Sequence, residues 1–127
     1  MSNDVLDFTA KKVDLMIERD TTVDFTVQYT DADSVPIDLT GFAAKMEVRP
    51  RFGDNTPVLS LLSSGITGSR LIVNDVAGEI RVIVDEDDTG SVPVADYVYD
   101  LVLYKNDDVR RLIAGTFILQ DAVTATA

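Results

Sequence analysis

Apolar and polar residues alternate in several short stretches of the chain. The clearest alternation covers residues 23–29, where Val, Phe, Val and Tyr are interleaved with Asp, Thr and Gln. Residues 42–49 alternate in the same way, and residues 13–17 do so over a shorter length. Because successive side chains of a strand point to opposite faces of a sheet, each stretch predicts a strand with one buried face.

Two hairpins are predicted in the second half of the chain. The first joins residues 71–73 to residues 80–84 through a turn that contains Gly78, a residue that adopts positive φ at little cost. The second joins residues 97–103 to residues 109–119 through a polar turn. Together with the earlier strands, these hairpins predict an all-β fold, an immunoglobulin-like antiparallel β-sandwich of seven or eight short strands.

One stretch does not fit the strand pattern. Residues 85–92 begin with four acidic residues, which are favourable in the first turn of a helix, and Gly90 and Pro93 lie where such a helix would end. We therefore expect at most a short helical turn near 85–92. Residues 50–57 and 63–69 are rich in Gly, Ser, Asn or Pro and are expected to form loops.

The strand pattern divides the chain of 127 residues into three parts. The length corresponds to one domain with one core. We expect residues 13–120 to form the sandwich, residues 1–12 an N-terminal arm and residues 121–127 a C-terminal tail. Arms of this kind are able to become ordered against a partner.

The composition favours strands and gives an acidic protein. Val, Ile and Thr, which favour strands, account for 37 of the 127 residues. The 22 Asp and Glu outnumber the 11 Lys and Arg, and the net charge of −11 repels phosphate backbones and anionic lipids. We therefore expect neither nucleic acid nor a membrane as a partner. Lys45, Arg49 and Arg51, and separately Arg110 and Arg111, form basic clusters suited to an acidic protein surface.

Few kinds of chemistry are open to the chain, because it has neither Cys nor His. Their absence excludes thiol and imidazole catalysis and the usual transition-metal ligands. The glycine motifs that bind phosphate are also missing. We expect no enzyme activity, no catalytic residue and no cofactor. Acidic clusters at 31–33, 85–88 and 107–108 leave an irregular calcium site open, although the residues after Asp31 do not match an EF-hand.

Two remote alternatives remain. Asp88, Thr89 and Gly90 form the triplet that supplies the catalytic carboxylate of dimeric aspartic proteases, but here further acids precede the triplet where such an enzyme has an apolar strand. A carbohydrate-binding module would need aromatic rings on an outer face. The chain has no Trp, and most of its aromatic residues fall on the inward side of the strand pattern.

Tyr97 and Tyr99 lie at the start of a late strand. Immunoglobulin-like sandwiches often place a tyrosine there, whose hydroxyl ties the corner to nearby backbone. We therefore interpret Tyr97 and Tyr99 as a structural corner.

Several segments together resemble a group of small tailed-bacteriophage proteins. These segments are Val35–Phe42 (VPIDLTGF), Met46–Arg49 (MEVR), Tyr97–Leu101 (YVYDL) and Arg111–Thr116 (RLIAGT). The group is associated with tails, baseplates and fibres, and the chain is similar to the immunoglobulin-like N-terminal module of upper baseplate proteins over residues 13–124. Relatives tend to have Gly before the first tyrosine of YVYDL, where this chain has Asp96.

The resemblance implies a non-enzymatic virion protein, an assembly or adaptor subunit of the tail, baseplate or fibre-attachment region. Its expected location is the virion. Its expected partners are other phage structural proteins, such as the tail tube, hub or fibre, with repeated copies in a symmetric assembly. The candidate interface residues are Val5, Leu6 and Phe8 in the arm, and Lys45, Arg49 and Arg51 in the domain. A capsid decoration or neck protein is the alternative.

Overall fold

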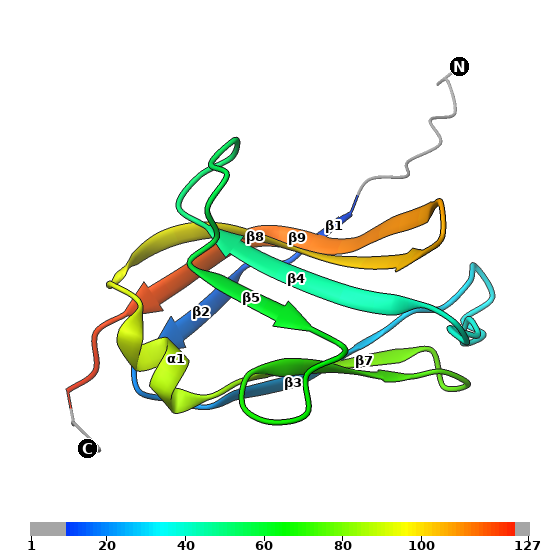
Figure 1. Ribbon diagram of the computed structural model, residues 1–127, viewed down its shortest axis with the longest axis horizontal. Helices are drawn as coiled ribbons and strands as arrows, with labels where there is room; N and C mark the ends of the chain where they lie inside the picture. The colour runs from blue at the N-terminus through cyan, green and yellow to red at the C-terminus, as the bar shows by residue number, and fades with distance from the viewer. Residues whose placement is uncertain (1–9, 124–127) are drawn as a thin grey trace.

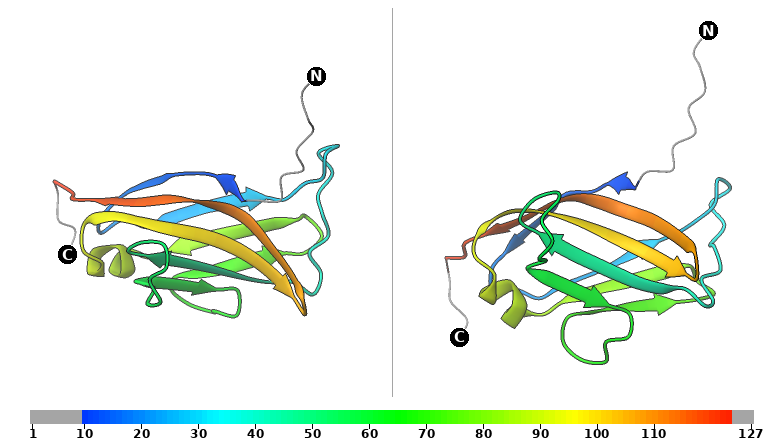
Figure 2. Two further views of the ribbon diagram at one scale, coloured as in Figure 1. Left: turned by 90° about the horizontal axis from the view of Figure 1, so that it is seen from above. Right: turned by 45° about the horizontal axis from the view of Figure 1, so that its top comes forward.

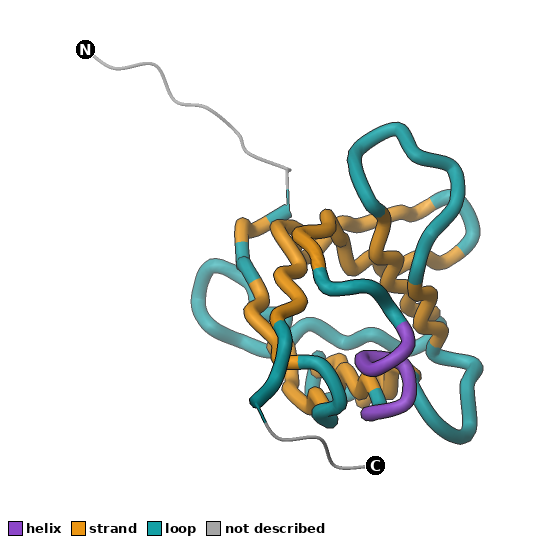
Figure 3. Tube along the Cα trace, turned by 90° about the vertical axis from the view of Figure 1, so that its left-hand side faces the viewer, coloured by secondary structure: helices purple, strands orange, loops and turns teal. Residues whose placement is uncertain are grey.

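The computed structural model describes residues 10–123. Its strands form two β-sheets that pack face to face, an immunoglobulin-like β-sandwich (Figures 1 and 2). The strands are β1 (Lys11–Lys12), β2 (Leu15–Glu18), β3 (Val23–Gln28), β4 (Ala43–Arg49), β5 (Leu59–Leu62), β6 (Arg70–Asn74), β7 (Glu79–Val84), β8 (Ala95–Lys105) and β9 (Asp108–Gln120). One short helix, α1 (Glu86–Ser91), lies at one end of the sandwich among the described residues (Figure 3). The all-β prediction is confirmed.

The larger sheet has six strands in the order β1-β9-β8-β4-β5, and β2 also pairs with β9. Both β1 and β2 run parallel to β9, so they act as two pieces of one interrupted edge strand. The smaller sheet has the order β3-β7-β6 and is antiparallel throughout. No helix among residues 10–123 is long and apolar enough to cross a membrane.

Both predicted hairpins are present. β6 and β7 pair antiparallel across a turn in which Gly78 has φ +64°, and β8 and β9 pair across a turn in which Asn106 has φ +53°. The expected helical turn is α1, whose N-cap residue Asp85 accepts a hydrogen bond from the Asp88 amide. Each of these features follows from a local sequence signal.

Two parts of the fold differ from the sequence pattern. The pattern missed β5, a four-residue strand in which Leu61 is fully buried. The single strand expected at 13–17 is interrupted, and Lys11–Lys12, assigned to the N-terminal arm, pair with β9 as β1. The arm residues Val5, Leu6 and Phe8 lie outside the described residues.

The core lies between the two sheets, and its largest fully buried side chains include Phe117, Leu101 and Met46. β3 carries the clearest alternation in the sequence, yet its inward side chains are only half-buried. The reason is its position at the edge of the smaller sheet, where a hollow of about 1120 Å³ opens between β3 and the start of β9. The sequence pattern identified the inward face correctly, but not how deeply it is buried.

Of the two tyrosines expected at the corner, Tyr99 bonds to the distant Val13 carbonyl, and Tyr97 makes the local contact. Its ring is buried and its hydroxyl donates a hydrogen bond of 2.5 Å to the Pro93 carbonyl, four residues upstream. This bond ties the start of β8 to the segment that follows α1.

Tyr97→Phe is expected to lower the free energy of unfolding by about 1 kcal/mol, because it removes one hydrogen bond and keeps the ring. Urea unfolding followed by circular dichroism measures this change. Tyr104→Phe is the matched control, since the Tyr104 side chain is exposed and has no hydrogen bond within the described chain. An equal loss in both variants would contradict the corner.

Candidate functional site

A hollow of about 770 Å³ lies on the outer face of the six-stranded sheet, the face turned away from the core. Its floor is formed by β4, β8 and β9. One rim is β1 and the opposite rim is the loop of residues 50–57, which rises beyond the β4–β5 hairpin (Figure 1). We call this depression the cationic hollow, because of the side chains that line it.

Five of the eleven Lys and Arg of the chain line the cationic hollow: Lys12, Lys45, Arg49, Arg51 and Arg111. Only two acidic side chains, Glu47 and Asp100, accompany them. The lining therefore has a formal charge of +3 on a protein whose net charge is −11. The alternation of β4 explains part of this concentration, because Lys45, Glu47 and Arg49 all point to the outer face.

The two acids are shared by three of the five cations. Glu47 forms ion pairs with Arg49 at 2.8 Å and with Lys45 at 3.7 Å, and Asp100 pairs with Arg111 at 3.8 Å. The remaining two cations are Lys12 and Arg51, one on each rim. Within residues 10–123, neither has an acidic side chain within ion-pair distance.

The loop at the rim is held by its own hydrogen bonds. The Arg49 guanidinium donates to the Asp54 carbonyl, and the Asp54 amide donates to the Arg51 carbonyl at 3.2 Å. The Thr56 amide donates to the Asp54 carboxylate at 3.0 Å. The loop therefore presents Arg51 and Phe52 in a defined arrangement, and the Phe52 side chain is 83% exposed. An aromatic ring this exposed, beside an arginine, is typical of an interaction surface.

The opposite rim, β1, is held in place by contacts at Val13 and Asp14, the two residues between β1 and β2. The Tyr99 hydroxyl donates to the Val13 carbonyl at 2.6 Å, and the Thr116 amide donates to the Asp14 carboxylate at 2.9 Å. Gly115 lies directly against this break, because a Cβ at that position would collide with the Val13 carbonyl. These contacts fix β1, and with it Lys12, beside β9.

Burial raises the pKa of Tyr99 to about 12, and the nearby Asp14 carboxylate adds to the increase. The unfolded chain, in which a tyrosine ionises near 10, therefore loses its proton first as the pH rises. The contribution of Tyr99 to stability is complete below pH 10 and decreases between pH 10 and 12. We expect unfolding titrations at pH 9 and 11.5 to show a larger loss of stability for the wild type than for Tyr99→Phe. Equal losses would contradict this linkage.

The cationic hollow brings together three of the candidate interface residues, Lys45, Arg49 and Arg51. Of the neighbouring pair Arg110 and Arg111, only Arg111 lines the cationic hollow. Arg110 pairs with Asp108 and contacts the aromatic rings near the other hollow, whose edge Arg111 also lines.

Sequence reasoning missed the roles of Lys12 and Phe52. Lys12 was assigned to the arm, and an isolated Phe in a loop has no periodic pattern that would mark it. The available signal was the combination Arg-Phe-Gly at 51–53, an aromatic residue beside a turn glycine and a cation. Gly53 does adopt φ +83° in the loop.

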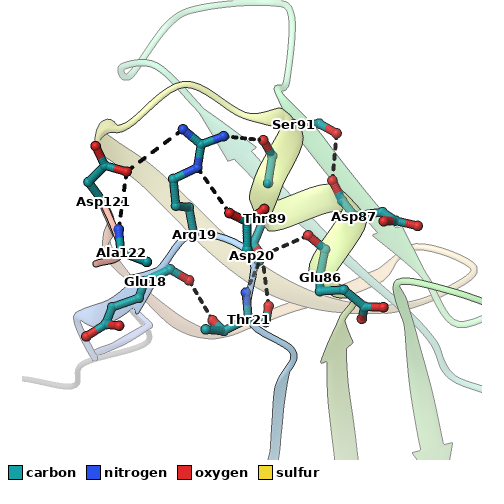
Figure 4. A network of polar contacts seen from close by, with 11 residues as sticks. Glu18, Arg19, Asp20, Thr21, Glu86, Asp87, Thr89, Ser91, Asp121 and Ala122 are labelled. Atoms are coloured by element: carbon teal, nitrogen blue, oxygen red, sulfur yellow. Dashed lines mark hydrogen bonds and ion pairs between the residues drawn. The ribbon is translucent and has the colours of Figure 1, made fainter. Parts of the chain in front are cut away.

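The triplet Asp88, Thr89 and Gly90 lies within α1, and Figure 4 shows its middle residue, Thr89, beside Thr21. Thr89 is fully buried and hydrogen-bonds to the Thr21 backbone, while the Asp88 carboxylate accepts from the Ser69 hydroxyl and the Gly90 carbonyl accepts from Arg19. All three residues thus have structural contacts that join α1 to neighbouring segments.

The acidic clusters at 31–33, 85–88 and 107–108 are spread over separate loops and the helix. In the described part of the chain, no group of three or more acidic side chains is close enough to hold a metal ion. The Asp31 carboxylate instead accepts hydrogen bonds from the amides of Asp33 and Val35. Asp108 forms an ion pair with Arg110.

Comparisons with known proteins do not assign a function to this chain. No protein-family model matches this chain, and no curated protein matches it. Among solved structures, it is similar to the extracellular fragment, including the stalk region, of novel immune-type receptor 11 from Ictalurus punctatus. The identity is 13% over 97% of this chain and 91% of that chain, with a TM-score of 0.34. A likeness this weak carries no functional argument, and the fold assignment follows from the strand order and register described above.

Proposed function

We propose that this chain is a non-enzymatic structural subunit of a tailed bacteriophage, an adaptor that joins neighbouring proteins of the tail, baseplate or fibre-attachment region. The resemblance of its short sequence segments to such proteins supports the phage assignment. The cationic hollow supports the adaptor role, and it is the single observation that carries this part of the proposal. A sheet face with an excess of unpaired cations and an exposed aromatic ring is suited to protein contact.

The remote enzyme alternative has weaker support. Asp88 would be the catalytic carboxylate of an aspartic protease. It lies in the short helix α1, and its carboxylate accepts a hydrogen bond from the Ser69 hydroxyl. Incubation of the protein and of Asp88→Asn with a peptide library tests this alternative, and cleavage by the first protein alone would establish it in place of the adaptor role.

Electron microscopy tests the phage assignment. Gold-labelled antibodies against the purified protein are applied to phage particles made by the cell that encodes it. Label at the tail tip or the fibre base is the expected result, and label on the head or neck would favour the capsid decoration or neck protein. Particles that carry no label although the protein is made would overturn the virion assignment.

A further inference from the structure

The five cations of the cationic hollow outnumber the two acidic side chains that line it. Three of its five cations share two acids, whereas Lys12 and Arg51 have no acidic partner within residues 10–123. An unpaired cation at the edge of a concave surface favours a carboxylate from a partner, because the surrounding protein lowers the effective dielectric constant. The hollow therefore has places for at least two negative groups.

The backbones that carry these two cations lie several strands apart. Lys12 lies in β1 and Arg51 lies two residues beyond the end of β4, and the strand order places β9 and β8 between β1 and β4. Three strand spacings correspond to about 14 Å at the level of the backbone. An extended peptide rises about 3.3 Å per residue, so acidic residues about four positions apart on one segment would reach both cations.

Apolar surface in the same hollow indicates which kind of anion fits. Phe52 stands exposed beside Arg51, and Val98 and Val102 form half-buried parts of the floor. Phosphates carry no apolar group and sugars offer only the C–H faces of their rings, whereas a protein segment carries both carboxylates and apolar side chains. The net charge of −11 also repels a long polyanion, while a short segment contacts the local positive charge within one Debye length of about 8 Å.

We propose that the cationic hollow binds an extended acidic segment of a partner protein, with carboxylates at Lys12 and Arg51 and an apolar side chain against Phe52. This inference rests on the proposed adaptor function and names the chemistry of the neighbour that the adaptor holds. The hydrogen bonds around Asp54 and Val13 hold both rims in place, so the hollow is formed before the partner arrives.

Binding of a model peptide tests the inference with the full chain. The probe is a fluorescein-labelled ten-residue peptide in which Glu alternates with Leu, and the comparison peptide has Gln in place of Glu. Fluorescence anisotropy is expected to show binding of the Glu peptide at least about tenfold tighter than of the Gln peptide. Raising the salt concentration from 50 to 300 mM is expected to weaken the binding of the Glu peptide.

Substitutions locate the binding site. Lys12→Glu with Arg51→Glu is expected to weaken binding of the Glu peptide about tenfold, and Phe52→Ala to weaken it severalfold. Lys11→Glu with Arg70→Glu is the matched control, because it changes the net charge by the same amount at exposed or half-exposed positions outside the hollow. The control is expected to change affinity less than twofold. Thermal unfolding of each variant confirms that it is folded.

Three outcomes would overturn the inference. These are equal binding of the Glu and Gln peptides, equal weakening by both double variants, and binding of heparin in the hollow by a protein that does not bind the Glu peptide. The last outcome would identify the ligand as an anionic polysaccharide. None of these outcomes depends on where the protein lies in a particle, so failure here is distinguishable from failure of the labelling experiment.

Discussion

Gly115→Ala is expected to lower the free energy of unfolding by about 3 kcal/mol, a large effect for the addition of one methyl group. The new Cβ would collide with the Val13 carbonyl and lie 2.8 Å from the Asp14 carboxylate. The carbonyl belongs to a backbone that is hydrogen-bonded to β9 and cannot move without losing those bonds. The new methyl group therefore separates β1 from β9 and releases the hydroxyl of Tyr99.

Urea unfolding measures the loss of stability, and amide hydrogen exchange at Val13 and Thr116 reports whether β1 has separated. Gly53→Ala is the matched control, because a Cβ there has no atom within 4 Å and costs only the positive φ of +83°, about 1 kcal/mol. Equal losses for the two variants, or unchanged exchange at Val13, would show that the break between β1 and β2 accepts a side chain.

Thr89→Val is expected to lower the free energy of unfolding by about 2 kcal/mol although the two side chains have the same shape. Thr89 is 0% exposed, and its hydroxyl accepts from the Thr21 amide at 3.1 Å and donates to the Thr21 carbonyl at 2.8 Å (Figure 4). Valine would leave both backbone groups without their partner beneath the helix. These bonds link α1 to the turn that joins β2 to β3, beside the hydrogen bonds that Arg19 and Thr22 of the same turn donate to Gly90 and Glu86.

Thr89→Ser is the control for this link, because it keeps the hydroxyl and removes one methyl group, at a cost of about 1 kcal/mol. Guanidinium unfolding of both variants gives the comparison. A valine variant as stable as the serine variant would mean that water replaces the threonine hydroxyl. The result also bears on the triplet at 88–90, since a large effect of Thr89→Val supports a structural role for it.

Local signals in the sequence identified the hairpins, the corner and the helix correctly. Gly78 and the polar residues at 105–108 marked turns, the acidic residues at 85–88 marked the first turn of a helix, and Tyr97 was recognised from its place near the start of a strand. Each signal depends on residues within about four positions of one another, so no knowledge of the rest of the fold was needed.

The candidate site was predicted only in part. Lys45, Arg49 and Arg51 are close in sequence, and the structure places them on one rim and the floor of the cationic hollow. Lys12 and Arg111 join them only because β9 pairs with β8 and β1 pairs with β9 in the larger sheet. No short-range pattern indicates which distant strands become neighbours.

The sequence by itself determined most of the strands, their inward faces and the hairpin turns, because a period of two and a turn residue act over a few positions. The tertiary structure decided that β3 is an edge strand with a half-buried face, and that β5 exists at all. It also decided that five cations meet on one outer face. Strand order depends on contacts between residues far apart in the chain, and the free energy of those contacts is set by the complete packed core.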